Sequence, residues 1–405
     1  MTCENGQDCL GRPMADHVPA HLIRSLDWFA DEPFELASSI LSEEQPLVYT
    51  LCNPMFGQSW VPTRADIMRR IAGDPALFAS KGQSGFAELI GENWSLAPLE
   101  VDPPDHAKLR KLISPWFSPA SVAKLGEKAK RHASKLVDQF IDKKGCEFKT
   151  DFAEHLPVAI FLDLMGWPQD LAPMFRSWSS KLIHSDSARV RAECVRSITD
   201  YLRDMIAARR TAPQDDMTSS LVHSQIDGKE LSNDELLGLL TLLFLGGLDS
   251  VTAALTFQFY HLARYPTLQR RLRARPEDIP KAIEEMLRFN GQSVNSRRAT
   301  ADTEIEGVEI KKGDWISLIW AVANRDGREH QNADVLNIDR ANKRHMTFSF
   351  GPHFCIGHNL ARREIQCAYD QMPTRLPPFR LGNPSTARMH GGITFGIDRL
   401  DLRWD

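Results

Sequence analysis

Residues 347–363 read TFSFGPHFCIGHNLARR, and no other part of the chain carries so specific a signal. Cys355 stands between Gly351 and Gly357, directly before a segment with helical spacing that begins near His358. A thiolate in that position would face backbone N–H groups and a helix N-terminus, which stabilise negative charge. The glycines would let the backbone approach a flat partner closely. The pattern makes Cys355 a candidate ligand.

Other interpretations of this cysteine remain open from the residues alone. A lone cysteine is commonly a small buried hydrophobe. A zinc site is a second possibility, because His345, His353, Cys355 and His358 are near neighbours, although they lack the paired spacing of ordinary zinc sites. A catalytic cysteine would need a base with its own orienting partner, and the sequence nominates neither.

The composition is that of a soluble globular protein. The chain has 405 residues, of which 42% are hydrophobic and 25% charged, so it can bury a large core and is not disordered. A net charge of −4 argues against general nucleic-acid binding.

Seven scattered cysteines and the absence of an apolar core in residues 1–13 predict a reducing, cytoplasmic location without secretion. The longest nearly apolar run, residues 236–248, is shorter than the about 20 residues of a membrane span, so no membrane partner is expected.

The spacing of apolar residues predicts a mainly α fold with a smaller β-rich part. A hairpin is expected over residues 48–61, and a helix over 63–71 with Thr63 as its N-cap. A long helix is expected from about Asn233 to Arg264, because a capping-box sequence begins at Ser232. Further helices are expected over 105–118, 119–144, 149–165, 168–183, 189–210, 266–273 and 278–289, and short strands over 303–310, 313–323 and 392–404. We interpret residues 1–405 as one large domain, with 1–30 as a partly flexible lead-in.

The cysteine segment resembles the haem-binding loop of the cytochrome P-450 superfamily, F-x-x-G-x-H/R-x-C-x-G followed by L-A-R. The residues that match are Phe348, Gly351, His353, Cys355 and Gly357. The resemblance implies the fold of that family, with a long distal helix over the haem, and Cys355 as the thiolate ligand of the iron of haem b. One departure is Ser349, where glycine is common.

A pair of residues before the strands extends the resemblance. Glu285 and Arg288 match the family's E-x-x-R motif, in which the pair locks to an arginine upstream of the cysteine loop. Arg325 and Arg340 are both candidates for that partner. By spacing alone, the pair could equally be a solvated ion pair of little energy.

The distal helix of the family carries A/G-G-x-D/E-T, and Gly246-Gly247-Leu248-Asp249-Ser250 resembles it. Two glycines inside a helix cost about 1 kcal/mol each relative to alanine, so a close approach to a bound plane is a plausible reason for them. Ser250 replaces the usual threonine, and its hydroxyl can bond the Gly246 carbonyl four residues before it. The resemblance implies that Asp249 and Ser250 deliver protons to bound O2, the co-substrate.

Further residues match the family's contacts with the haem and the substrate. The D-P-P-x-H-x-x-x-R segment supplies His106 and Arg110, which with Arg297 and His353 would hold the two haem propionates; Arg298 competes with Arg297. The residues that fall at substrate-pocket positions are Trp94, Leu242, Leu245, Gly246, Ser293, Asn295, Ile393 and Thr394. The local sequence is similar to that of the soluble bacterial members that hydroxylate camphor and cineole. Trp94 stands where the camphor enzyme has a tyrosine, which argues against camphor itself.

The resemblance predicts a soluble haem-thiolate monooxygenase that hydroxylates a small hydrophobic substrate, with a terpenoid as one candidate. The sequence leaves no segment for a flavin or an iron–sulfur cluster, so electrons would come from a separate [2Fe–2S] ferredoxin with a flavin-dependent NAD(P)H reductase. Basic residues on the cysteine side fit an acidic partner: Lys108, Lys111, Lys343, Arg344, Arg362 and Arg363. The alternatives are a peroxide-driven enzyme with the same ligand and a non-catalytic haem sensor or carrier.

Overall fold

The computed structural model describes the chain except residues 1–14, 25–46, 54–56, 186 and 384–386. Most of the predicted lead-in over residues 1–30 therefore lies outside the described residues. What is described of it contains a single 3-10 turn, η1 (Ala20–Leu22).

The residues group into two compact units, each built from separate stretches of the chain. Unit 1 comprises residues 1–83, 280–355 and 385–398, and unit 2 comprises residues 84–279, 356–384 and 399–405. The prediction of one domain over 1–405 is not tested by this grouping and stays a prediction.

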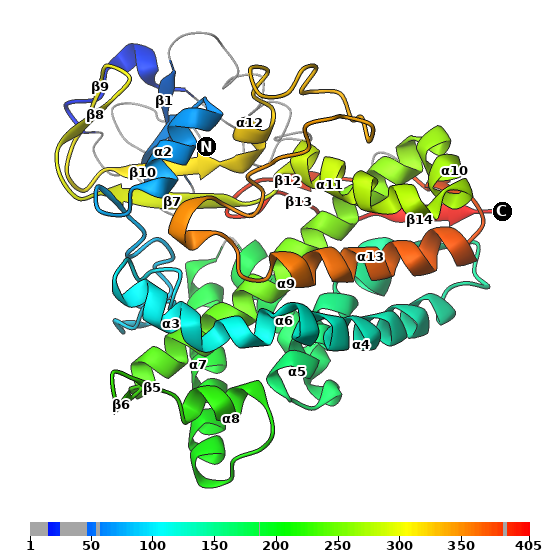
Figure 1. Ribbon diagram of the computed structural model, residues 1–405, viewed down its shortest axis with the longest axis horizontal. Helices are drawn as coiled ribbons and strands as arrows, with labels where there is room; N and C mark the ends of the chain where they lie inside the picture. The colour runs from blue at the N-terminus through cyan, green and yellow to red at the C-terminus, as the bar shows by residue number, and fades with distance from the viewer. Residues whose placement is uncertain (1–14, 25–46, 54–56, 186, 384–386) are drawn as a thin grey trace. The chain divides into compact units, whose positions relative to one another are not determined.

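Unit 1 is built on a five-stranded sheet (Figure 1). Its strands, in spatial order, are β1 (Val48–Asn53), β2 (Gly57–Pro62), β10 (Trp315–Ile319), β7 (Val294–Ala299) and β3 (Phe78–Ala79). All neighbours are antiparallel except β2 and β10, which run parallel. The predicted hairpin over 48–61 is confirmed as β1–β2. The other elements are α2 (Ala65–Gly73), nearly all of α11 (Ile279–Asn290), β8 (Thr303–Ile305), β9 (Val308–Ile310), α12 (Trp320–Asn324), η7 (Gly351–His353), β12 (Met389–His390) and β13 (Gly396–Ile397).

Unit 2 is mainly helical. Its helices are α3 (Asp105–Ile113), α4 (Pro119–Asp138), α5 (His155–Met165), α6 (Ala172–His184), α7 (Ala188–Thr211), α8 (Met217–Val222), α9 (Asn233–Arg264), α10 (Pro266–Ala274) and α13 (His358–Arg375). Short turns of helix are η2 (Glu88–Ile90), η3 (Ser114–Phe117), η4 (Lys149–Ala153), η5 (Gln169–Leu171) and η6 (Pro276–Asp278). The hairpin β5 (Gln225–Ile226) and β6 (Lys229–Glu230) precedes α9, and β11 (Phe379–Leu381), β14 (Asp401–Trp404) and β4 (Gly145–Glu147) form a small sheet.

Helix α9 is the central element of unit 2, packing against α5, α6, α7 and α13 (Figure 1). It begins and ends where the sequence predicts, and the Ser232–Glu235 capping box is present at its start. In the described part of the chain, it is the one helix long and apolar enough to cross a membrane, but 67% of that apolar stretch is buried inside the protein. Burial of this kind is what a core helix shows.

Four local predictions are wrong. Thr63 does not cap α2, because its hydroxyl donates to the Leu47 carbonyl and the helix starts after Arg64. The strand predicted over 303–310 is a hairpin of β8 and β9, because the chain turns at Glu306 and Gly307, which both have positive φ. The strand predicted over 313–323 ends at Ile319 and continues as helix α12, and the strand predicted over 392–404 is broken into β13 and β14. Strand β7 was not predicted as an element.

Candidate active site

The segment around Cys355 folds back on itself through backbone hydrogen bonds. The Cys355 N–H donates to the Phe348 carbonyl at 2.8 Å, and the Phe354 N–H donates to the Gly351 carbonyl at 3.1 Å. The Cys355 side chain is half-buried and forms no disulfide. The loop therefore presents a thiol on a short, internally bonded turn, as a ligand would need.

Two residues of this loop adopt left-handed backbone conformations. Gly351 has φ +73°, and a Cβ there would lie 2.6 Å from the Ala72 carbonyl oxygen, so only glycine fits. Ser349 has φ +66°. This is the position where the family commonly has glycine, and the conformation gives the reason for that preference.

Large apolar side chains lie uncovered beside Cys355. Of the large hydrophobic side chains that the structure describes, five are exposed, and two of them, Phe350 and Phe354, flank the cysteine. Phe348, which the motif also contains, is buried. Uncovered aromatic rings on the segment that leads to the thiol suit a flat apolar partner.

The zinc interpretation finds no support in the described residues. Among them, no three His, Cys, Asp or Glu side chains gather in a way that could hold a metal ion. His345, one of the four neighbours considered, lies with its Nε2 3.4 Å from a carboxylate oxygen of Glu284.

The Glu285–Arg288 pair is fully buried and bidentate, with both N···O distances 2.9 Å. Arg340 completes it, because its Nε donates to Glu285 at 3.2 Å. Arg325 instead stacks on Phe289, with its guanidinium carbon 4.2 Å from the ring centroid. Burial alone would raise the pKa of Glu285, but the bonds from Arg288 and the Asn337 N–H lower it on balance. The pair is thus a buried ionic cluster with Arg340, not a solvated surface pair.

Asn324 joins this ionic cluster to the cysteine segment, a connection that sequence reasoning missed. Its carbonyl accepts from Arg288 at 2.8 Å, and its side-chain oxygen accepts from the Met346 N–H at 2.6 Å. Its amide nitrogen donates to the Thr347 hydroxyl at 2.9 Å. The ionic cluster therefore fixes the start of the cysteine loop.

Two of the four predicted propionate ligands belong to unit 1, and both are buried. Arg297 on β7 is 1% exposed, and its Nη1 donates to the Ser296 carbonyl. His353 in η7 is 8% exposed. The competitor Arg298 points to the opposite face of β7, where it is exposed and bonds the Gly313 carbonyl. Strand alternation therefore favours Arg297.

The other two predicted ligands lie on α3 in unit 2. His106 is buried at 4% exposure, and Arg110, one turn later, is half-buried. Residues four apart share a helix face, so both side chains can serve one anionic partner.

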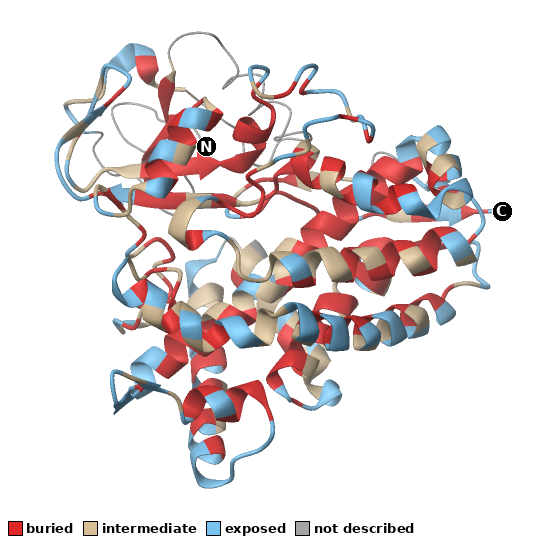
Figure 2. Cartoon of the chain, viewed as in Figure 1, coloured by how far each residue is buried: buried red, intermediate tan, exposed pale blue. Residues whose placement is uncertain are grey.

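Helix α9 leaves one stripe of its surface uncovered, although most of the helix is buried (Figure 2). The residues of this stripe that recur at helical spacing are Leu242, Leu245, Gly246, Asp249 and Ser250, all half-buried or exposed. Steps of three and four residues place them on one face. We call them the open stripe. Five of the predicted catalytic, haem and substrate residues therefore share it.

The local geometry of the open stripe matches the predicted groove. The Ser250 hydroxyl donates to the Gly246 carbonyl at 3.2 Å, which confirms the predicted bond. No described atom lies within 4 Å of where a Cβ of Gly246 would stand. Thr252 turns away and donates to the Leu248 and Ala153 carbonyls, so it cannot take the role of Ser250.

The remaining predicted substrate residues have mixed surroundings. The indole N–H of Trp94 donates to Glu92 at 2.6 Å, and the amide oxygen of Asn295 accepts from Trp320 at 2.7 Å. Ser293 and Thr394 form an antiparallel bridge, and Ile393 is exposed beside it. Each unit thus contributes apolar or neutral side chains, but the polar tips of Trp94 and Asn295 are used inside the protein.

The donor set fits a haem. Unit 1 offers a half-buried thiol on a segment with uncovered aromatic rings, and the basic residues Arg297 and His353 are buried in the same unit. Unit 2 offers a second pair of basic side chains and a helix face with space above Gly246. A thiolate, flat apolar walls and basic side chains are what an iron porphyrin with two propionates needs.

Comparison with known proteins gives consistent results. The family described as Cytochrome P450 matches residues 167–275 and 279–372. The "Probable cytochrome P450 127A1" of Sinorhizobium fredii is 34% identical over 97% of both chains. The "Steroid C26-monooxygenase" of Mycolicibacterium smegmatis is 32% identical over 76% of this chain and 78% of its own. The crystal structure of cytochrome P450 CYP101C1 covers 97% of this chain and 100% of its own, at 29% identity and a TM-score of 0.86. That of CYP101J2 covers 97% and 99%, at 28% identity and a TM-score of 0.85.

Proposed function

The chain belongs to the cytochrome P450 family and is a haem-thiolate monooxygenase with haem b as cofactor and O2 as co-substrate, and from this premise we propose its substrate class and partner. The substrate is a small hydrophobic molecule, with terpenoids as the first class to test, and it is hydroxylated with electrons from a separate [2Fe–2S] ferredoxin. The observation that carries the substrate class is the open stripe of α9, whose leucines need an apolar cover.

The residues proposed to hold the haem are Cys355 as iron ligand and His106, Arg110, Arg297 and His353 toward the propionates. When bound, the haem supplies the activation of O2 by an electron-rich iron. Phe348 and Gly357 flank the ligand in sequence, and Gly246 leaves space on the distal helix. The protein's part is ligation, orientation and control of protons.

Asp249 and Ser250 are proposed to deliver the protons that the reaction consumes. The Ser250 hydroxyl donates to the Gly246 carbonyl, which orients its oxygen while leaving the helix face open. Asp249, the preceding residue, is an acid on the same open stripe. A carboxyl and a hydroxyl at adjacent positions can pass a proton from solvent toward the bound oxygen.

The substrate would be held by the side chains of Trp94, Leu242, Leu245, Ser293, Asn295, Ile393 and Thr394. Because the N–H of Trp94 is bonded to Glu92, Trp94 would contact the substrate through its ring rather than by a hydrogen bond. An apolar contact of this kind favours a substrate without a strong acceptor group.

An acidic ferredoxin is supported by the basic residues on the cysteine side. Lys111 and Arg344 are exposed, and Lys343, Arg362 and Arg363 are half-buried. Lys108 and Arg363 are weaker candidates, because Lys108 is paired with Asp105 and Asp227 and Arg363 with Glu127. The reaction is proposed to take place in the cytoplasm, where a flavin-dependent reductase can supply NAD(P)H electrons.

The ligand assignment is tested with Cys355→His. The wild-type protein, reduced and exposed to carbon monoxide, should show the red-shifted Soret band that thiolate ligation produces, and the variant should lose it while still binding haem. A variant that keeps the band would remove Cys355 from the iron.

The substrate and partner are tested together. Small hydrophobic compounds are screened for a low-spin to high-spin shift, and the best one is supplied with NADH, reductase and ferredoxin. Product formed only in the presence of ferredoxin supports the proposal. Product formed equally well with hydrogen peroxide alone would favour a peroxide-driven enzyme, and binding without any product would favour a sensor or carrier.

A further inference from the structure

Residues 84–101 of unit 2 form a segment that we call the strap, and it carries Trp94. Apart from the short turn η2, the strap has no regular structure. A segment of this length without regular structure needs specific contacts to hold one conformation. Three such contacts are present: one lies within the strap, one is with α9, and one reaches α7.

The first contact is a buried carboxylate that closes the strap on itself. Glu100 is 6% exposed. Its Oε1 accepts from the Ser84 N–H at 2.6 Å, and its Oε2 accepts from the Leu96 N–H at 2.8 Å. One side chain therefore joins the beginning of the strap to the residues that follow Trp94.

The second contact is a glycine notch on α9. A Cβ at Gly238 would lie 1.9 Å from the Ser95 carbonyl oxygen, a distance that no side chain tolerates. The strap therefore crosses α9 at a position where only hydrogen fits. This accounts for a helix glycine that otherwise costs about 1 kcal/mol relative to alanine.

The third contact fixes Trp94 itself. Its indole N–H donates to Glu92 at 2.6 Å, and the same carboxylate oxygen accepts from Arg203 on α7 at 2.7 Å. Trp94 is 6% exposed, so little of the ring is free to move into solvent.

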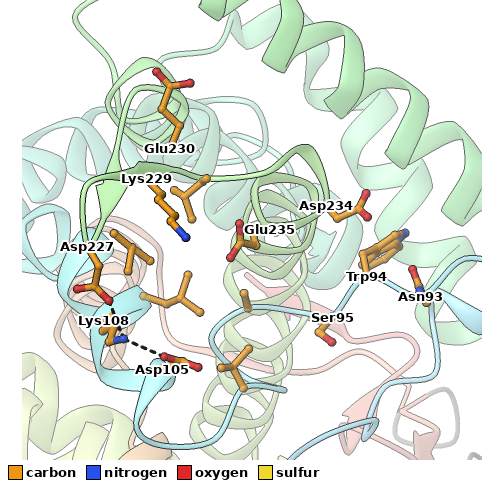
Figure 3. Close-up of a pocket in the computed structure, with 15 residues that line it drawn as sticks. Asn93, Trp94, Ser95, Asp105, Lys108, Asp227, Lys229, Glu230, Asp234 and Glu235 are labelled. Atoms are coloured by element: carbon orange, nitrogen blue, oxygen red, sulfur yellow. Dashed lines mark hydrogen bonds and ion pairs between the residues drawn. The ribbon is translucent and has the colours of Figure 1, made fainter.

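The strap forms one wall of a cavity of about 590 Å³ within unit 2 (Figure 3). The strap residues that line it are Asn93, Trp94, Ser95, Ala97 and Val101. The other walls are the first turns of α3, the β5–β6 hairpin and the first turn of α9. A cavity of this volume lies in the range of small-molecule sites. Of the predicted substrate residues, Trp94 is the one that lines it, and the five Asp and Glu side chains in its walls are exposed to solvent.

We propose that Glu100 and Gly238 are positioning residues for ligand recognition, because together they hold the strap, and with it Trp94, as a fixed wall against a small ligand. The inference rests on the proposed function in one respect: it takes Trp94 as a wall of the substrate site. Specificity then depends on a wall formed before the ligand arrives, and weakening either anchor loosens the fit for bulky ligands.

Protonation of Glu100 adds a pH dependence to this arrangement. Burial raises the pKa of Glu100, and the N–H groups of Leu96 and Ser84, which favour the carboxylate, only partly oppose that shift; the charge of Glu88 raises the pKa further. By linkage, a raised pKa means that the anchored strap holds the Glu100 proton more tightly than an opened strap would. The strap should therefore loosen as the pH rises through the pKa of Glu100.

The test uses the haem-loaded protein at pH 7.5 and two azoles that bind the iron, imidazole and 4-phenylimidazole. Glu100→Gln and Gly238→Ala should each raise the Kd of 4-phenylimidazole about tenfold, the ratio that about 1.4 kcal/mol produces, and leave the Kd of imidazole within about twofold. Glu88→Gln is the matched control: it removes the same charge from an exposed position of the strap and should change neither value. An unchanged Kd ratio in Glu100→Gln would overturn the proposal.

Hydrogen exchange gives a second readout that does not depend on the haem ligand. Amide protection of peptides from the strap should fall about tenfold in Glu100→Gln but not in Glu88→Gln, while peptides from α4 and α13 keep theirs. In the wild type, strap protection corrected for intrinsic exchange should fall as the pH is raised from 5.5 to 8, and in Glu100→Gln it should be flat. If strap protection is unchanged in Glu100→Gln, Glu100 does not anchor the strap. A wild type without the thiolate spectrum refutes only the proposed function, because the exchange result still decides the role of Glu100.

Discussion

Two stretches of helix α9, which we call the open half (residues 242–250) and the covered half (residues 251–263), differ in what covers them. Residues 251–263 are all buried, whereas in residues 242–250 the open stripe is uncovered. Both halves are apolar, so hydrophobicity alone does not separate them. Each Å² of apolar surface that a core helix leaves in water lacks about 25 cal/mol of the stabilisation that burial would give. We interpret the open half as the part that contacts a ligand and the covered half as the part that packs the core.

The packing on each half supports this division. Phe259 in the covered half stacks on Phe148 with ring centroids 4.4 Å apart, and it also contacts Tyr369 and Phe379. In the open half, the position of a Gly246 Cβ has no described neighbour within 4 Å. Stability should therefore depend on the covered half, and turnover on the open one.

The largest expected effect is the loss of stability in the covered half. Phe259→Ala should lower the free energy of unfolding by about 3–5 kcal/mol, because it leaves a cavity among aromatic rings. Leu245→Ala, in the half-buried open stripe, should cost about 1 kcal/mol. Denaturant unfolding of the haem-loaded variants measures both values. Equal losses would show that the two halves do not differ.

The next effect concerns turnover in the open half. Asp249→Asn should slow product formation about 10- to 1000-fold, the usual worth of general acid catalysis, with little change in stability or haem content. Steady-state turnover with ferredoxin, beside a denaturation curve, checks this. If turnover is unchanged, proton delivery must use another residue, and a sensor role would regain support.

A pH-dependent effect is expected in the packing of α13 around α9. Glu364 is 3% exposed, and its Oε2 has no hydrogen-bond partner among the described residues. Burial raises its pKa well above the ordinary value, so the folded protein holds its proton more tightly than the unfolded chain does. Stability should thus fall as the pH rises from the unfolded pKa toward the folded one, by up to about 1.4 kcal/mol per pH unit.

The measurement for Glu364 is the free energy of unfolding of wild type and Glu364→Gln between pH 5 and pH 8. The glutamine variant should lack this component of the slope, so the difference between the two proteins should change with pH. Parallel curves would mean that Glu364 does not titrate over that range.

The smallest expected effect is on coupling at Ser250. Ser250→Thr keeps the hydroxyl that bonds Gly246 and should keep product formation coupled to NADH consumption. Ser250→Ala should still consume NADH but release several-fold more hydrogen peroxide, because it lacks the hydroxyl that orients protons. Product and peroxide formed per NADH are measured in all three proteins. An alanine variant as well coupled as wild type would assign the role to ordered water or a substrate group.

The sequence predicted best those features that depend on local patterns. Helix α9 was placed correctly because Ser232 and Glu235 form a capping box in front of an apolar run. The Ser250–Gly246 bond followed from helix geometry alone. Strand β7 was not predicted as an element, because its sequence, VNSRRA, has the two arginines and little apolar alternation. The burial of Arg297 depends on neighbouring strands, which no local pattern encodes.

The candidate site was predicted as a list of residues rather than as an arrangement. The choice of Arg340 over Arg325 depends on which cation reaches Glu285 across 55 residues of chain, and spacing cannot decide that. The roles of Asn324, Glu100 and Gly238 were missed because each acts on the backbone of a distant segment. Contacts between side chains and a remote backbone leave little periodic signal in a sequence.

The division into discontinuous units has a consequence for biosynthesis. Unit 1 includes the β12–β13 hairpin, and in unit 2 strand β14 pairs with β4, more than 250 residues earlier. The five-stranded sheet of unit 1 is complete once residue 319 has been made, whereas the small sheet of unit 2 cannot form until residues near 400 have left the ribosome. Strand β4 therefore stays unpaired with β14 during nearly all of synthesis, which leaves an open strand edge in the growing chain.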